Sequence, residues 1–467
     1  MSTQNHGGVS ERSCDIFSLI DTFYCVLLNF RSPLSDVVSQ PTPWSERISE
    51  RYQCVLAPDL ADWLDREIWK RNGTGEFRLP IPADGLLSDA PDEIWPGLMP
   101  CDLLPILGDS DGNWVCVRAD ANNQMGEMVQ WFHGGGDWMP WGKRLADAIV
   151  FEAVVERLPG PRRRLAIPAE NPKQNFDPLN DPFVHWAFEH QTKAIRELLA
   201  EQTSSQESAE VLLRENIACE AVRCELVQDA MHQPWASRLN GKLASQIGLS
   251  WNDCVSWMFD AGRMPDDAWN LLKEKLKLSD HDRGEQDWSA VEMHCRAVID
   301  ATTDSARQIA WAWDLLGYAI ERRGDSSAAI DTYQQGANAS SFTDQAVRMN
   351  SHWMQQEAAK FSVARLQKLD PNRVADSKYL SSLLATNTQS CRQQVVEYWM
   401  DQANQATSEV QRHERLMKAG WDVGVDSFVR YSTLLDRVAE AAEAAGQHAR
   451  ASLAKTHRRC LRNRYGV

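Results

Sequence analysis

Two motifs of this chain contain the residue types of a serine hydrolase. Residues 108–112 read Gly-Asp-Ser-Asp-Gly, which matches the GxSxG nucleophile motif, and residues 133–136 read His-Gly-Gly-Gly, as in an esterase oxyanion loop. In those enzymes the serine precedes a helix and the oxyanion loop comes earlier in the chain. Here the order is reversed, and the apolar run Trp114–Val117 after Ser110 predicts a strand. We therefore expect a hairpin turn, and a hydrolase that uses Ser110 is the less favoured alternative.

Metal chemistry is not predicted. Asp109, Asp111, Asn113 and Asp120 are spaced somewhat like the ligands of a calcium-binding loop, but the glycine is at the fourth position and the twelfth is not Glu. His185 and His190 are five residues apart, about 140° around a helix, so they do not share a face. The eleven cysteines contain no CxxC pair, which is typical of reduced thiols in a cytosol. We expect no metal and no cofactor.

The elements that must position these residues are short strands. Three apolar runs are separated by Asp, Asn, Ser and Gly, so they predict consecutive antiparallel strands at Leu103–Leu107, Trp114–Val117 and Met128–Phe132. The spacing of apolar residues then changes to three and four, which predicts a closing helix through Ala148, Phe151, Val155 and Leu158.

A partner-contact surface is one interpretation of the aromatic residues in this region. Trp131 and His133 share one face of the third strand, and Trp138 and Trp141 follow in a glycine-containing loop. Tryptophan is enriched in binding hot spots, so these residues together with the acidic turn could contact a protein. The other interpretation, that the tryptophans cover the domain core, stays open. The candidate contact residues are Asp109, Asp111, Trp131, His133, Trp138 and Trp141.

The same region resembles the SUKH superfamily, which includes bacterial immunity proteins and fungal cell-wall regulators of the Smi–Knr type. The resemblance rests on the Leu-Pro-Ile start at 104–106, the Asp-rich turn and the Trp/His-rich strand before a helix. Upstream residues agree: a helix start at Leu56–Pro58, its end at Asn72-Gly73, and the Gly-Leu-Leu-Ser segment at 85–88. The resemblance covers residues 41–158. It implies an α+β fold and a protein-binding role without a common chemistry.

Beyond residue 183, helical periodicity replaces the strand pattern. We expect an N-terminal tail with a short helix at 1–40, the SUKH-like domain at 41–158, a Pro-rich linker at 159–182 and an all-α, repeat-like domain at 183–467. Predicted helices include Phe183–Glu201, Glu207–His232, Asp266–Leu276, Trp288–Ala301 and Ser326–Ala337.

One helix pair, near residues 305–340, resembles a tetratricopeptide repeat. In that repeat, the positions of Gly317 and Ala329 hold small residues so that the two helices approach closely. The positions of Trp313 and Tyr333 hold large residues that fill the wedge between the helices. Ile320, Gly336 and Ser341 depart from the consensus, so we expect an irregular array. The matching positions are Trp313, Leu316, Gly317, Gly324, Ala329 and Tyr333.

The net charge of the chain limits the kinds of partner that we expect. The chain has 49 Lys and Arg against 65 Asp and Glu, a formal net charge of −16, which argues against a general nucleic-acid binder. Such acidity suits a protein that masks a basic partner, such as a nuclease toxin, although it also simply promotes solubility. The basic run 455–464 is expected on a terminal helix, where cations are favoured.

These observations favour a non-catalytic, cytoplasmic protein-binding protein, in the more specific form an immunity-type protein that captures a toxin. No stretch approaches the length and apolarity of a membrane span. The alternative is a regulatory scaffold unrelated to toxins. The oligomeric state does not follow from the sequence.

Overall fold

A curled, six-stranded mixed sheet occupies the N-terminal half of the described chain. The computed structural model describes residues 42–160, 177–201, 203–301, 309–344, 347, 358–384 and 388–467. The predicted tail and helix at 1–40 and most of the predicted linker lie outside these residues. The strands are β1 (Val55–Leu56), β2 (Leu79–Pro80), β3 (Leu103–Gly108), β4 (Trp114–Ala119), β5 (Gln124–Trp131) and β6 (Trp138–Gly142).

The strand order is β1-β5-β4-β3-β2, and β6 pairs with β5 beside β1. Strands β3 to β6 are antiparallel neighbours, as expected for three of them, whereas β1 lies parallel to β5. The two hairpin turns are built by aspartates. Asp109 accepts hydrogen bonds from the backbone N–H groups of Asp111 and Asn113, both at 2.8 Å, and Asp120 likewise caps the next turn.

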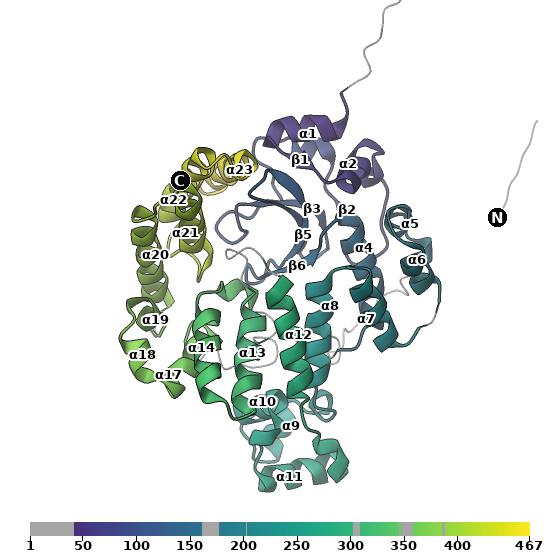
Figure 1. Cartoon of the computed structure of the whole chain (residues 1–467). Coiled ribbons are helices and arrows are strands. Elements are labelled where there is room, and N and C mark those ends of the chain that lie inside the picture. The colour runs from purple at the N-terminus through teal and green to yellow at the C-terminus, as the bar shows by residue number, and fades with distance from the viewer. Residues whose placement is uncertain are drawn as a thin grey trace, which may run out of the picture. The chain divides into compact units, whose positions relative to one another are not determined.

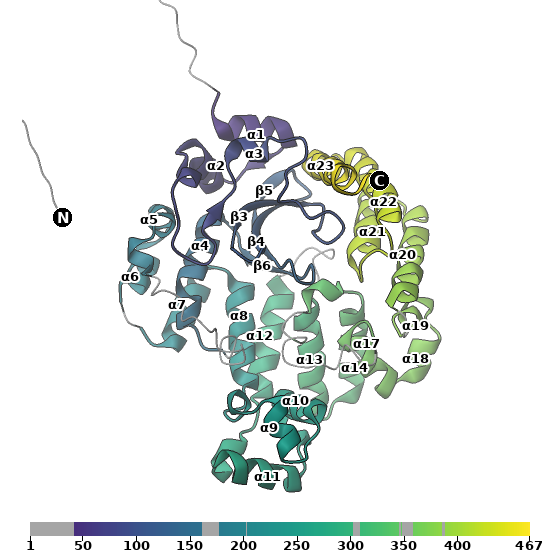
Figure 2. The same ribbon diagram turned by 180° about the vertical axis from the view of Figure 1, so that it is seen from behind.

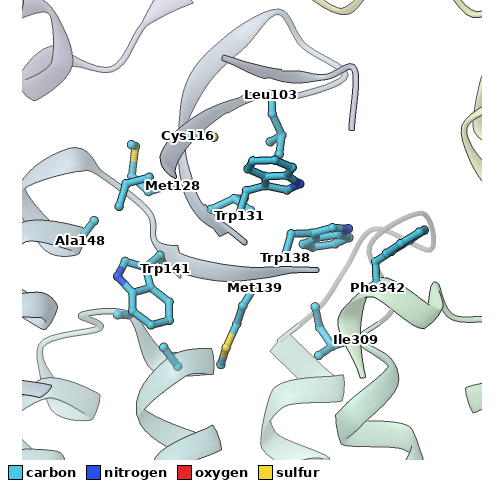
Figure 3. Packing of buried hydrophobic residues seen from close by; sticks show 14 of the residues in the cluster. Leu103, Cys116, Met128, Trp131, Trp138, Met139, Trp141, Ala148, Ile309 and Phe342 are labelled. Atoms are coloured by element: carbon cyan, nitrogen blue, oxygen red, sulfur yellow. The ribbon is translucent and has the colours of Figure 1, made fainter. Parts of the chain in front are cut away.

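Helices cover the sheet, so all six residues of β3 are buried. Figure 3 shows Met128 and Trp141 on the side of the helix that closes the predicted meander, and Trp131 and Trp138 on the side of Ile309 and Phe342. The N-terminal helices are α1 (Trp44–Tyr52), α2 (Pro58–Asp65), α3 (Ala83–Leu86) and α4 (Leu145–Val154).

In the C-terminal half, helices pack mainly against their neighbours in the chain and follow one another around the sheet (Figure 1). The first of them are α5 (Pro182–Glu189), α6 (Lys193–Ala200), α7 (Ser205–Arg214), α8 (Cys219–Met231), α9 (Gly241–Gln246), α10 (Trp251–Phe259), α11 (Asp266–Leu276) and α12 (Trp288–Ala301). The remaining ones are α13 (Ala310–Arg322), α14 (Ser326–Ala337), α17 (Phe361–Leu369), α18 (Pro371–Ala375), α19 (Lys378–Ser382), α20 (Thr388–Asn404), α21 (Glu409–Trp421), α22 (Phe428–Ala444) and α23 (His448–Tyr465). A mixed sheet followed by mostly helices agrees with the predicted succession of α+β and all-α parts.

Helices α9 to α11 project from the remainder of the helical part (Figure 2). They have a small hydrophobic core of their own, separate from the large core. They lie between α8 and α12, which pack against each other, so this segment is an insertion into a helix pair.

Helices α13 and α14 form the pair that resembles a tetratricopeptide repeat. A Cβ at Gly317 would lie 2.6 Å from Cδ1 of Tyr333, so only glycine permits this approach of the two helices. Gly324 ends α13 with a φ of +92°, and Ala329 and Leu316 are buried. Tyr333 is fully buried in the wedge, whereas Trp313 stays partly exposed.

The last helix, α23, packs against the N-terminal sheet. Arg450 Nε donates to the carbonyl of Ala119 at 3.0 Å, and His457 Nε2 bonds to the carbonyl of Leu103 at 3.0 Å. One hydrophobic core extends from Ile48 to Leu461. Residues 42–467 therefore form one compact unit, in which the sheet and the helices share this core. Periodicity reports which face of a helix is buried, but not what covers it.

Several predicted boundaries were wrong. Glycines at 134–136 suggested a loop through Trp141, but β6 follows them because the turn is short enough for its strand to pair with β5. The helix that starts at Pro58 ends at Asp65, not at Asn72-Gly73. The predicted helices Phe183–Glu201 and Glu207–His232 are each two helices. Within the described residues, no helix combines the length and the apolar character needed to span a bilayer.

Candidate functional site

The three tryptophans predicted to contact a partner are core residues. Trp131, Trp138 and Trp141 are 0%, 6% and 1% exposed. Trp141 packs edge-on against Phe151 of α4, with ring centroids 4.7 Å apart, and Trp138 lies under the guanidinium of Arg118 at 4.3 Å. Strand alternation assigned only Trp131 of the three to a face of the sheet, and helices cover both faces. The prediction that these side chains form a contact surface is therefore wrong.

The acidic turn between β3 and β4 does not have the geometry of an esterase or of a calcium loop. Ser110 is exposed at the tip of a hairpin, and β4 follows it where a nucleophile elbow requires a helix. Asp109 is buried because its carboxylate accepts three hydrogen bonds within the turn, including one from Asn113 Nδ2 at 2.7 Å. Asp111 is exposed. Among the described residues no group of His, Cys, Asp and Glu could hold a metal ion.

His133 joins this turn to a second loop. Its backbone N–H donates to Asn113 Oδ1 at 3.0 Å, which holds the β5–β6 turn beside the β3–β4 turn. Its ring lies edge-on against Trp95, with centroids 4.3 Å apart, and both side chains are half-buried. The β3–β4 turn thus lies beside His133, since a Cβ on Gly112 would lie 3.6 Å from the His133 ring, and Trp95 packs against the same ring.

The end of α23 attaches to the loop that carries Trp95. Arg464 donates to the carbonyl of Asp92 at 2.6 Å and lies 4.8 Å from the centroid of the Trp95 ring. One turn earlier, Arg459 donates to the carbonyl of Asp89 at 2.8 Å. The basic run 455–464 lies on the terminal helix, as expected, with Arg462 and Arg464 in its last turn. Two of its arginines also bind carbonyl groups of the loop at 89–92, so they fasten α23 to the N-terminal half.

Four large apolar side chains are exposed where these segments meet. Leu98 is 38% exposed, Phe428 46%, Val429 66% and Tyr465 38%. The Phe428 and Tyr465 rings stack, with centroids 4.2 Å apart and planes 13° from parallel. Such a cluster costs solubility, and exposed apolar patches commonly mark interaction sites.

Close contacts join Phe428 and Leu98 to the loops that carry Trp95 and His133. A Cβ at Gly97 would lie 3.4 Å from Phe428, and a Cβ at Gly136 would lie 3.3 Å from the Cβ of Leu98. Gly97 has a φ of +97°, which glycine adopts without strain and which turns the loop against α22. We call the whole set the aromatic rim: Trp95, Leu98, His133, Phe428, Val429, Arg464 and Tyr465.

Of the predicted contact residues only His133 belongs to the aromatic rim, and Arg464 was noted only as part of the basic run 455–464. Phe428 and Val429 open α22, and Tyr465 closes α23, so in the sequence they look like ordinary helix ends. The usable signal was weak: two adjacent large apolar residues directly after the N-cap Ser427, a position where a polar residue is usual.

Comparison of the chain with known protein families, with curated proteins and with solved structures finds no match. The aromatic rim is therefore interpreted from its own chemistry. It presents apolar and aromatic surface with charged groups beside it, and it holds no group placed as a nucleophile with a neighbouring base. Such an arrangement suits the burial of a partner's side chains.

Apart from the aromatic rim, a cluster of polar side chains lies inside the helical part and is fully enclosed. Lys360 pairs with Asp422, and its ammonium also donates to the carbonyls of Ala337 at 2.8 Å and Ala339 at 2.6 Å. Asp422 accepts from Tyr379 and from Trp399, both at 2.8 Å. Burial, together with the Asp422 charge, raises the pKa of Tyr379. The cluster links α17, α19, α20 and the end of α21, and we assign it a structural role.

Proposed function

We propose that this protein is a non-catalytic binding protein that captures a protein partner on the aromatic rim. The observation that carries the proposal is the gathering of four exposed, large apolar side chains from three separate segments of the chain. The described residues contain ten such side chains, and the other six are distributed over β1, β2, the segment before α5, α11, α12 and α21.

The rim has the composition of a binding hot spot. Aromatic residues and arginine dominate hot spots because they bury large areas with few rotatable bonds. Phe428 and Tyr465 are already stacked on each other, and Trp95 is held between His133 and Arg464. Partner binding would therefore order few additional side chains, which lowers its entropic cost.

In its more specific form the proposal is an immunity-type protein of the cytoplasm that neutralises a toxin. Its support is the resemblance of residues 41–158 to the SUKH superfamily, and the succession of antiparallel strands β3 to β6 and helix α4 is consistent with that resemblance. A regulatory scaffold is the alternative within the same class, and genomic neighbours would separate the two. The hydrolase alternative loses its geometric support at Ser110, which lies in a hairpin.

Replacing Phe428 tests the proposal. Affinity purification of the full chain from its native host should recover a stoichiometric partner, which is then purified for a binding measurement. We expect Phe428→Ser to weaken that binding by about 30-fold, since a central hot-spot residue contributes about 2 kcal/mol. Isothermal titration calorimetry with both proteins purified measures the change.

Leu271→Ser is the matched control, because Leu271 of α11 is 43% exposed and lies outside the rim. We expect this variant to bind like the wild type. Equal affinities of wild type and Phe428→Ser, or an equal loss in both variants, would exclude the aromatic rim as the binding surface.

A further inference from the structure

We infer that the aromatic rim binds a proline-rich segment of the partner in the polyproline II conformation. This inference rests on the proposed function and adds the chemistry of the bound segment. Its basis is the pairing, within the rim, of aromatic rings with hydrogen-bond donors that the fold leaves unused. An occupant must therefore supply both apolar surface for the rings and acceptors for the donors.

Two aromatic residues of the rim carry these unused donors. Neither the indole N–H of Trp95 nor the hydroxyl of Tyr465 has a hydrogen-bond partner among the described residues. Trp95 is half-buried without its indole nitrogen being enclosed, and Tyr465 is 38% exposed. A partner that covers these two groups must offer acceptors, because a donor that is buried without an acceptor costs binding energy.

The two donors belong to aromatic rings that are held in place before binding. The Tyr465 ring stacks on Phe428, with centroids 4.2 Å apart. The Trp95 ring packs edge-on against His133, with centroids 4.3 Å apart. A Cβ at Gly97, two residues after Trp95, would lie 3.4 Å from the Phe428 ring, so the loop that carries Trp95 lies against the stacked pair. The rim therefore offers two neighbouring aromatic units with one donor each.

Two other conformations of a bound segment fit these groups less well. A helix bonds its carbonyls internally, so its backbone presents no acceptor to the two donors. An added β-strand needs a strand with a free edge as its partner. The described residues of the rim lie instead in the loop at 95–98, the β5–β6 turn, the start of α22 and the end of α23.

A polyproline II segment has the complementary chemistry. It forms no internal hydrogen bonds, so its backbone carbonyls can accept from an indole N–H and from a hydroxyl. Its proline rings are apolar, and aromatic-lined surfaces are a recurring mode of recognising such segments. The conformation is already populated in the free segment, so binding orders little additional chain. The rim therefore suits a proline-rich segment better than a helix or a strand.

The test selects random peptides displayed on phage against the intact chain, with Phe428→Ser as the counter-selecting protein. We expect the enriched peptides to carry two prolines three positions apart, because three residues per turn then place both rings on one side. In a synthetic copy, replacing either proline by alanine should weaken binding about tenfold. Raising the ionic strength from about 0.05 to about 0.3 M should change the affinity less than about twofold, since no charge pair is required.

Two variants of the protein test the donors themselves. Trp95→Phe and Tyr465→Phe each keep an aromatic ring and remove one donor, and each should weaken binding of the synthetic peptide about fivefold. Tyr465→Phe keeps the stack on Phe428, so it remains informative if Trp95→Phe disturbs its loop. Leu271→Ser is the control and should bind the peptide like the wild type.

The outcomes separate this inference from the proposed function. Peptides that require Phe428 but contain no prolines, or donor variants that bind as tightly as the wild type, would overturn the proline-rich occupant and leave the binding rim in place. Absence of any Phe428-dependent peptide would also overturn it, whereas calorimetry with the purified partner decides the proposed function independently. A dimer of the peptide-free chain that Phe428→Ser dissociates in sedimentation would make a second copy the occupant.

Discussion

Replacing Asp422 by Ala should lower the free energy of unfolding by about 3–5 kcal/mol, since it leaves the Lys360 ammonium buried without its counter-charge. Both side chains are 1–3% exposed, so neither can reach water without opening the helix packing around them. The Tyr379 hydroxyl and the Trp399 indole would lose their acceptor in the same step. Urea denaturation followed by circular dichroism measures the change.

Two controls belong to this prediction. Glu443→Ala removes an exposed ion pair with Lys455 at 2.9 Å and a contact with His448 at 3.2 Å, and should cost less than about 1 kcal/mol. The double variant Lys360→Met/Asp422→Ala should be less destabilised than the sum of its single substitutions, because no unpaired charge remains. If Asp422→Ala costs no more than Glu443→Ala, the cluster does not hold the helices together.

Acidification should weaken the attachment of α23 through His457. Burial lowers the pKa of His457 from 6.5 to about 4. Its Nε2–H donates to the Leu103 carbonyl at 3.0 Å, and within the described residues its Nδ1 has no hydrogen-bond partner, so a second proton would be buried without an acceptor. The unfolded chain takes up that proton near pH 6.5, the folded chain only near pH 4.

Stability from this residue is therefore complete above about pH 7 and is lost as the pH falls toward 4, by about 3 kcal/mol in total. Unfolding measured at several pH values should show this loss in the wild type and a correspondingly flatter profile in His457→Leu. The variant should also be less stable at neutral pH because the bond to Leu103 is gone. Parallel profiles would show that His457 is not the titrating group. Since α23 carries Arg464 and Tyr465, partner binding should weaken over the same pH range.

Local patterns predicted individual elements well. The predicted strand starts at Leu103 and Trp114 are exact, and the predicted helices at 266–276, 288–301 and 326–337 coincide with α11, α12 and α14. These segments have strong periodicity and clear end signals, such as Asp325, whose side chain caps α14 at 3.0 Å. β1 was missed because a two-residue strand has no period to detect.

Long-range packing could not be predicted from local sequence patterns. Strand alternation placed Trp131 and His133 on one face, but only the fold shows that Ile309 and Phe342 lie on that side of the sheet (Figure 3). The aromatic rim joins residues near positions 95, 133, 428 and 465. Its members become neighbours only because α23 returns to the first half of the chain, a contact that depends on carbonyls at Asp89, Asp92 and Leu103. Every residue carries a backbone carbonyl, so the pattern of side chains does not indicate which carbonyls will accept such hydrogen bonds.

Hydrogen–deuterium exchange of the intact protein, with and without its purified partner, tests the central claim most directly. If the partner binds the aromatic rim, exchange should slow on binding in four separate segments, namely residues 92–98, 132–137, 427–431 and 462–467. We expect no comparable change in α11. Protection confined to another surface, such as α9 to α11 or the α13–α14 pair, would contradict the assignment of partner binding to the rim.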